Sequence, residues 1–171
     1  IQTARHLVDA GAVGRVVGAT ANLFKQGVET WHPNPNFLYQ PGAGPLMDMG
    51  PYYLTALLHI VGPFASVSAM DAISFPTRKI TSQPHYGETI QVNVPTYVNA
   101  LLRFETGTLA TFTATFDVWK SRQPCLEIYG ETGSIVLSDP NCFGGRVMLA
   151  RPGEDYREVP LTFPYAQNSR G

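Results

Sequence analysis

Two neighbouring stretches of strictly alternating residues constrain the fold of this chain more than any other feature. Apolar side chains occupy every second position of each stretch, on either side of Glu105-Thr106-Gly107: first Val98, Ala100, Leu102 and Phe104, then Ala110, Phe112, Ala114 and Phe116. A period of two is typical of strands that bury one face, and a short turn between them makes the pair antiparallel. Residues 125–129 and 134–137 predict a second hairpin, across Gly130-Glu131-Thr132-Gly133.

The rest of the chain adds helices and further strands to this sheet. Helical spacing of apolar residues predicts a helix over 3–11 and a longer one over 46–61, which Gly62-Pro63 ends and Pro51 kinks in its first turn. Further strands are expected over 14–23, 65–72, 147–150 and 157–161, with a loop over 25–44 and a polar stretch over 77–88. This order predicts an α+β fold: a large, predominantly antiparallel open sheet with helices on one face.

The second face of the alternating pair is rich in threonine. Thr111, Thr113 and Thr115 lie on the side opposite the apolar residues. A sheet covered by helices on one face leaves the other to water or to another sheet. The sequence leaves both readings open: a solvated face, or a subunit interface of a homo-oligomer.

Composition narrows the class of protein. The length of 171 residues fits one domain, and a net charge of -1 without a basic stripe disfavours a nucleic-acid partner. The longest apolar stretch, 45–63, contains Asp48 and His59, which disfavours a membrane span. Cys125 and Cys142 form no disulfide framework, so a reducing, cytoplasmic location is expected.

The longer helix carries the first candidate site. Asp48, Tyr52, Thr55 and His59 follow one another at steps of four, three and four, which would place them on one polar stripe. A phenol can move a proton at a substrate hydroxyl, and a carboxylate can orient it or bind the hydroxyl. The alternative is a structural role for both residues. The carboxylate of Asp48 would interact favourably with the helix dipole in the first turn, and Tyr52 would pack against neighbouring side chains. For His59, a favourable interaction with the C-terminal end of the helix is the preferred explanation.

A second candidate cluster lies on the long loop. Its members are Lys25, Glu29, Trp31, His32 and Asn34. Aromatic and hydrogen-bonding side chains on one loop suit a polyhydroxylated ligand, although packing of Trp31 alone could explain the pattern. The four histidines are dispersed, and the sequence has no Walker loop, G-x-S-x-G or strand-linked G-x-G-x-x-G.

Three motifs in order resemble one family of oxidoreductases. The run Gly42-Ala43-Gly44-Pro45-Leu46-Met47-Asp48-Met49-Gly50-Pro51-Tyr52 is similar to G-G-G-x-L-x-D-x-G-x-H of the glucose–fructose oxidoreductase, inositol dehydrogenase and rhizopine-catabolism (Gfo/Idh/MocA) family. Residues 9–17 and 127–134 resemble the family's entry to its second domain and a later strand–turn–strand. The resemblance covers essentially the whole chain.

The resemblance implies a substrate-binding and oligomerisation domain over 1–171, without the family's N-terminal Rossmann domain and last C-terminal helix. It implies NAD or NADP in the full-length protein, no cofactor on this fragment, and a sugar, inositol or related polyol as substrate. Asp48 matches the family's aspartate, and Tyr52 stands where most members have the proton-transferring histidine. Thr55 replaces an acid often found there. Phenols ionise only near pH 10, so Tyr52 would need a cation such as the lysine of the missing domain.

These observations leave two functions open. The first is a dehydrogenase half in which Tyr52 and Asp48 are catalytic, and Lys25, Trp31, His32 and Thr55 contact substrate. The second is a non-catalytic binding or oligomerisation module of a redox-dead paralogue. A fragment without a cofactor site is expected to be inactive alone in either case.

Overall fold

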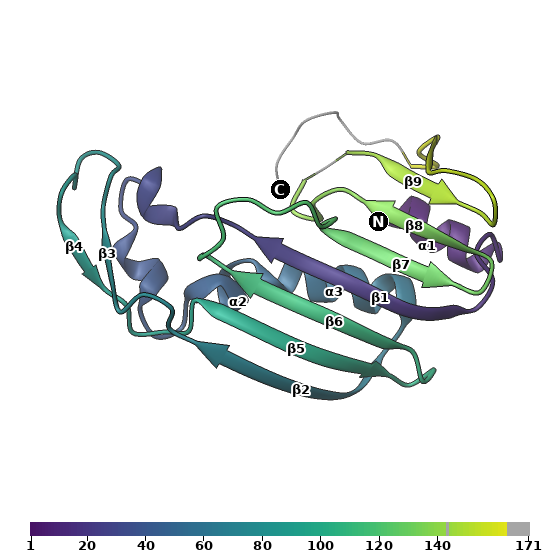
Figure 1. The fold of residues 1–171 in the computed structure, drawn as a ribbon, viewed down its shortest axis with the longest axis horizontal. Helices are drawn as coiled ribbons and strands as arrows, with labels where there is room; N and C mark the ends of the chain where they lie inside the picture. Colours follow the sequence, from purple (N-terminus) through teal and green to yellow (C-terminus); the bar gives the residue numbers. More distant parts are fainter. Residues whose placement is uncertain (143, 164–171) are drawn as a thin grey trace.

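The computed structural model describes residues 1–142 and 144–163, and it has one large sheet with helices on one side (Figure 1). The helices are α1 (Gln2–Asp9), α2 (Gly44–Asp48) and α3 (Gly50–Val61), with 3-10 helices η1 (Val28–Thr30) and η2 (Asn36–Tyr39). The strands are β1 (Val16–Phe24), β2 (Phe64–Ala72), β3 (Thr77–Lys79), β4 (Thr89–Gln91), β5 (Tyr97–Phe104), β6 (Leu109–Thr115), β7 (Leu126–Gly130), β8 (Gly133–Leu137), β9 (Val147–Ala150) and β10 (Arg157–Val159).

The large sheet has eight strands in the order β10-β9-β8-β7-β1-β6-β5-β2. Within the described residues, β1 and β6 form its one parallel pair, and every other neighbouring pair is antiparallel. The predicted fold class, α+β with a predominantly antiparallel open sheet and helices on one face, is therefore confirmed. Both predicted hairpins are present, as β5–β6 and β7–β8.

The main core lies between this sheet and the helices α1 and α3. It is built from the apolar side chains that the alternation predicts to be buried: Phe112 of β6 is 2% exposed, and Leu57 of α3 is fully buried. A Cβ on Gly50 would lie 3.1 Å from the Leu46 side chain and in ordinary contact, at 3.5 Å, with the Phe112 ring. The start of α3 is therefore packed tightly against α2 and rests on β6.

The predicted helix over 46–61 is two helices. Met49 separates α2 from α3, with φ of -118°, and its carbonyl accepts a hydrogen bond from the backbone N–H of Tyr52. Pro51 at the second position of α3 has no N–H to donate to the preceding turn, so a continuous helix would lose a hydrogen bond there. Asp48 and Tyr52 consequently lie on opposite sides of a helix break.

The stretches predicted as loop and as polar segment together form a small second unit, which we call the arm. It consists of η1, η2 and the hairpin β3–β4, and it projects from one end of the large sheet (Figure 1). The arm has a core of its own, consisting of Val28, Leu38, Tyr39, Ile80, Ile90, Val92 and Phe116. The hairpin was missed because each of its strands has only three residues, too few to show a period.

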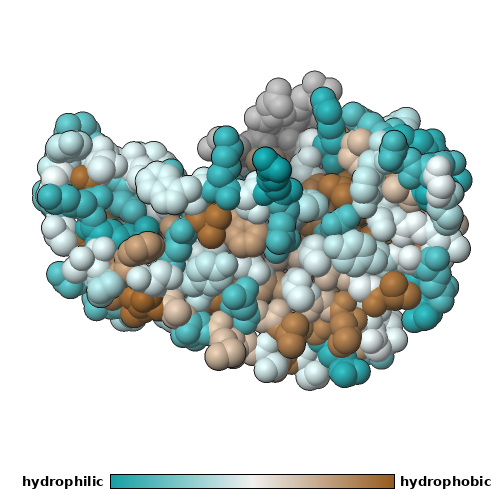
Figure 2. Space-filling model, viewed as in Figure 1, coloured by the Kyte–Doolittle hydropathy of each residue, from teal (hydrophilic) through white to brown (hydrophobic). Residues whose placement is uncertain are grey.

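The face of the sheet away from the helices is open, and Figure 2 looks onto it. Exposed apolar side chains, namely Met70, Leu101 and Leu109, lie there among Asn99, Arg103 and Thr111. The predicted threonine face is only partly right. Thr111 is exposed, but Thr113 donates to Asn99, and Thr115 is fully buried where it accepts a hydrogen bond from the N–H of Asp117.

Candidate functional site

Asp48 and Tyr52 are both exposed at the break between α2 and α3. Tyr52 keeps 41% of its surface accessible, although it belongs to the first turn of a packed helix. Desolvation raises the pKa of the Asp48 carboxyl above its ordinary value, and the nearby His32 acts in the opposite direction. The long loop therefore brings His32 near Asp48, which connects the two clusters expected from the sequence.

Hydrogen bonds hold the loop residue His32 on three sides. Its N–H donates to the carbonyl of Val28 (2.9 Å), its carbonyl accepts from Ser82 Oγ (2.6 Å), and its Nδ1 accepts from the N–H of Asn34 (3.0 Å). An accepting Nδ1 corresponds to the neutral tautomer with the proton on Nε2. The imidazole also meets the Trp31 ring edge-on, with the ring centroids 5.4 Å apart, while Trp31 stays 67% exposed. The loop thus presents an aromatic surface next to a fixed imidazole.

Lys25 belongs to a neighbouring polar cluster that the sequence did not reveal. Its ammonium lies 3.2 Å from Asp139, and the same carboxylate accepts a hydrogen bond from the hydroxyl of the buried Tyr53 (3.0 Å). Burial, and then the charge of the adjacent groups, raises the pKa of Tyr53 far above its ordinary value, so the phenol stays protonated as a donor. Asn141 of the same turn approaches the sulfur of Met49 (3.9 Å), which places this cluster beside the helix break.

Thr55 is exposed on α3, but its hydroxyl is used locally. It donates to the carbonyl of Pro51 at 2.6 Å, as threonines in helices commonly do. A ligand could therefore use the Thr55 oxygen only as an acceptor in this rotamer. His59 lies in the last turn of α3, and its carbonyl accepts from Arg5.

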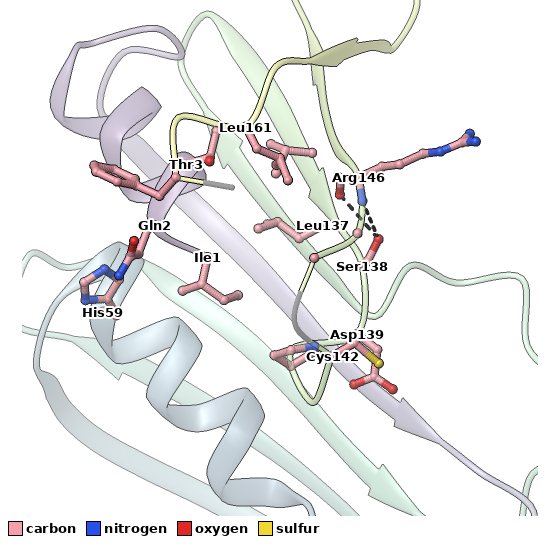
Figure 3. A pocket seen from close by; sticks show the side chains of 15 residues that line it. Ile1, Gln2, Thr3, His59, Leu137, Ser138, Asp139, Cys142, Arg146 and Leu161 are labelled. Carbon is pink, nitrogen blue, oxygen red and sulfur yellow. Dashed lines mark hydrogen bonds between the residues drawn. The ribbon is translucent and has the colours of Figure 1, made fainter. Parts of the chain in front are cut away.

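A cavity of about 350 Å³ lies at the other end of α3 (Figure 3). Ile1, His59, Asp139 and Arg146 are among the residues that line it, and Ser138 and Arg146 are joined by hydrogen bonds at its wall. None of the six predicted site residues lines it. Asp139 belongs both to the lining of this cavity and to the Lys25 cluster.

The residues present do not fit a nicotinamide dinucleotide. Such a cofactor needs a glycine-rich turn between a parallel strand and a helix N-terminus. Here β1 leads instead into the irregular loop with η1 and η2, and the sequence contains no matching glycine fingerprint. Within residues 1–142 and 144–163 no group of His, Cys, Asp or Glu could hold a metal ion, and no helix is long and apolar enough to cross a membrane.

Solved structures similar to this chain include oxidoreductase chains of more than twice its length. Levoglucosan dehydrogenase in complex with NADH and L-sorbose superposes with a TM-score of 0.75 at 20% identity, covering 99% of this chain and 48% of that one. Aldose-aldose oxidoreductase from Caulobacter crescentus complexed with glycerol gives a TM-score of 0.68 at 22% identity, covering 98% and 45%. An oxidoreductase domain protein from Kribbella flavida gives 0.67 at 25% identity, covering 91% and 42%.

The sequence itself identifies the family. The profile described as the GFO/IDH/MocA C-terminal domain matches residues 1–136. The chain therefore belongs to the GFO/IDH/MocA family, and the resemblance noted in the sequence is confirmed. A search of curated proteins finds no significant match.

Proposed function

We propose that this chain is the substrate-side and subunit-interface half of an NAD(P)-dependent oxidoreductase that acts on a sugar, inositol or related polyol. The observation that carries the proposal is that Asp48 and Tyr52 are both exposed at the break between α2 and α3, near the loop that carries His32. Support comes from structural relatives described as complexes with NADH and levoglucosan, with NADH and L-sorbose, and with glycerol. The nicotinamide would bind outside this chain and accept or supply the hydride.

Each residue has a distinct role in this proposal. Tyr52 exchanges a proton with the substrate hydroxyl, and Asp48 orients that hydroxyl as a hydrogen-bond acceptor. Trp31 and His32 form the wall against which the carbon face of the substrate lies. Lys25, held by Asp139, donates to a second hydroxyl, and Thr55 Oγ1 accepts from one.

The test is Tyr52→Phe in a longer protein that carries this domain and its nicotinamide-binding domain. Removing the phenolic proton should lower turnover by about 10²–10⁴-fold while the affinity for cofactor is retained. Tyr86→Phe is the matched control, because Tyr86 is 67% exposed on the arm and has no role in the proposal. Unchanged turnover in Tyr52→Phe would rule out the assignment. A wild-type protein that oxidises no sugar or polyol with either NAD or NADP would favour the non-catalytic binding module.

The open face is the proposed subunit interface. Leu101 and Leu109 are 65% and 54% exposed on it, and exposed apolar side chains that form a contiguous patch commonly mark an interaction surface. Leu101→Lys should convert a homo-oligomer into smaller species in sedimentation at micromolar concentration. Val67→Lys is the matched control: Val67 is 67% exposed, but it pairs with the buried Leu102 and so belongs to the opposite face. A monomeric wild-type protein would contradict the interface.

A further inference from the structure

A pocket of about 250 Å³ lies where the arm meets the end of β6, and we call it the arm pocket. Glu29 of η1 and Arg78 and Lys79 of β3 line it from the arm, Phe75 from the segment before β3, Gln26 from the segment after β1, and Trp119 from the segment after β6. It shares no residue with the proposed site around Asp48 and Tyr52. Its two aromatic side chains are unusually open, since Trp119 is 80% and Phe75 51% exposed.

The base of the arm pocket is a buried ion cluster. The Arg78 guanidinium bonds to Glu29 (3.0 Å) and to Asp117, and these three side chains are between 4% and 10% exposed. The same guanidinium lies over the rings of Tyr39 and Phe75, at 5.2 and 5.3 Å from their centroids. The three segments that line the pocket are thereby fixed in place, so a ligand would not have to order them.

Charge decides which ligand this pocket fits. The carboxylates of Glu29 and Asp117 balance the cations of Arg78 and Lys79, so the lining has no net formal charge. Both terminal nitrogens of Arg78 already bond to carboxylates, which leaves no fork for a phosphate or carboxylate ligand. The lining therefore favours a neutral ligand.

Two further features specify the chemical class. The exposed indole of Trp119 and the phenyl ring of Phe75 both line the pocket and offer flat apolar faces, while the rim residues Gln26, Thr30 and Thr81 offer amide and hydroxyl groups. Flat aromatic surface combined with such groups suits a pyranose ring, which has an apolar C–H face and a hydroxylated edge.

We propose that the arm pocket binds a neutral sugar ring, stacked on Trp119, at a place separate from the Asp48–Tyr52 site. The ring lies between Trp119 and Phe75, and its hydroxyls bond to the rim.

The chain contains two tryptophans, which makes a direct test possible. In Trp31→Phe, Trp119 is the single fluorophore of its kind. Methyl glycosides of glucose, galactose and mannose are titrated into this variant, with inorganic phosphate as the anionic comparison. A saturable change in Trp119 emission with at least one glycoside, and none with phosphate, is expected. Absence of a saturable change with all three glycosides, or a response to phosphate alone, would overturn the proposal.

Calorimetry with the responding glycoside locates the binding. Trp119→Ala should weaken binding about ten-fold, because it removes the stacking surface. Tyr86→Ala should leave the affinity unchanged, since Tyr86 is an exposed aromatic residue that does not line the pocket. Equal loss in both variants would overturn the assignment of the binding to Trp119. Because Trp119 is so exposed, its removal should not alter folding; Phe75→Ala serves as the second variant, and thermal unfolding of each variant confirms its integrity.

Discussion

The main core, between the large sheet and its helices, is built from apolar side chains. The core of the arm instead combines seven apolar residues with a buried guanidinium and two carboxylates. The main core gains free energy in proportion to the apolar area it removes from water. The arm is too small to do this alone, and it depends on Arg78 to join η1, β3 and the end of β6. The two cores therefore tolerate substitution differently. In the main core one apolar side chain can replace another of similar size, but in the arm each buried charge requires its oppositely charged partner.

Arg78→Met is expected to cause the largest loss of stability, and this loss should be confined to the arm. It leaves Glu29 and Asp117 buried without a cation, which typically costs about 3–5 kcal/mol. Because the cluster joins the arm and not the main core, the loss should appear as local opening. Amide hydrogen exchange at Thr81 and Ser82, whose N–H groups donate to the carbonyl of Glu29, measures it.

Arg146→Met is the control for that substitution. Arg146 pairs with Glu158 at 3.4 Å, and both side chains are more than half exposed, so the change should cost at most about 1 kcal/mol. Equal exchange rates at Thr81 in the two variants would show that the arm does not depend on its ion cluster.

Gly27→Ala tests the same contrast through the backbone. A Cβ on Gly27 would meet both carboxylate oxygens of Glu29 and lie 2.5 Å from Arg78 Nη1, so the ion pair must shift at a cost of about 1–3 kcal/mol. Gly18→Ala in β1 is the matched change in the large sheet, where the Cβ would find ordinary contacts of 3.4 and 3.5 Å. Urea unfolding should show Gly27→Ala to be clearly the less stable of the two. The opposite order would contradict the close approach of Glu29 to this glycine.

Asp48→Asn is expected to have the smallest effect on stability, and it should stabilise the chain, whereas the substitutions above destabilise it. The pKa of Asp48 is raised in the folded chain, so folding favours the protonated carboxyl. Its contribution to stability is present below the ordinary pKa of about 4 and is lost as the pH rises through the raised value. Asn should therefore raise Tm slightly at pH 7 and not at pH 3. A gain of the same size at both pH values would mean that ionisation of Asp48 is not responsible.

The sequence predicts the main core better than the arm for a physical reason. Phe112 and Leu57 follow periods set by secondary structure, so their burial can be read from local spacing. Arg78 lies in a polar stretch where exposure is the natural expectation. Arg78 is buried because Glu29 and Asp117, which are 49 and 39 positions away in the sequence, supply its partners. No local sequence pattern indicates such pairing.

The candidate site divides in the same way. Asp48 and Tyr52 are predicted as site residues from their spacing and motif, and the break at Met49 agrees with the kink expected from Pro51. Asp139 was not found, since its link to Tyr53 spans 86 residues and depends on how β8 follows β7 in the sheet. The acceptor of the Lys25 ammonium could be identified only from the fold.

The pairing of β1 with β6 and β7 also determines how long β1 must wait for its partners during synthesis. Gly18 lies opposite Leu109 on one side and Tyr129 on the other, so neither edge of β1 has its partner until most of the chain exists. At ribosomal rates of about 5–20 residues per second, β1 waits roughly 5–20 s with both edges open. During that interval the nascent chain displays an unpaired strand of nine residues, VVGATANLF, which contains no charge. An unpaired, uncharged strand of this kind is prone to pair with other chains until its own partners have been made.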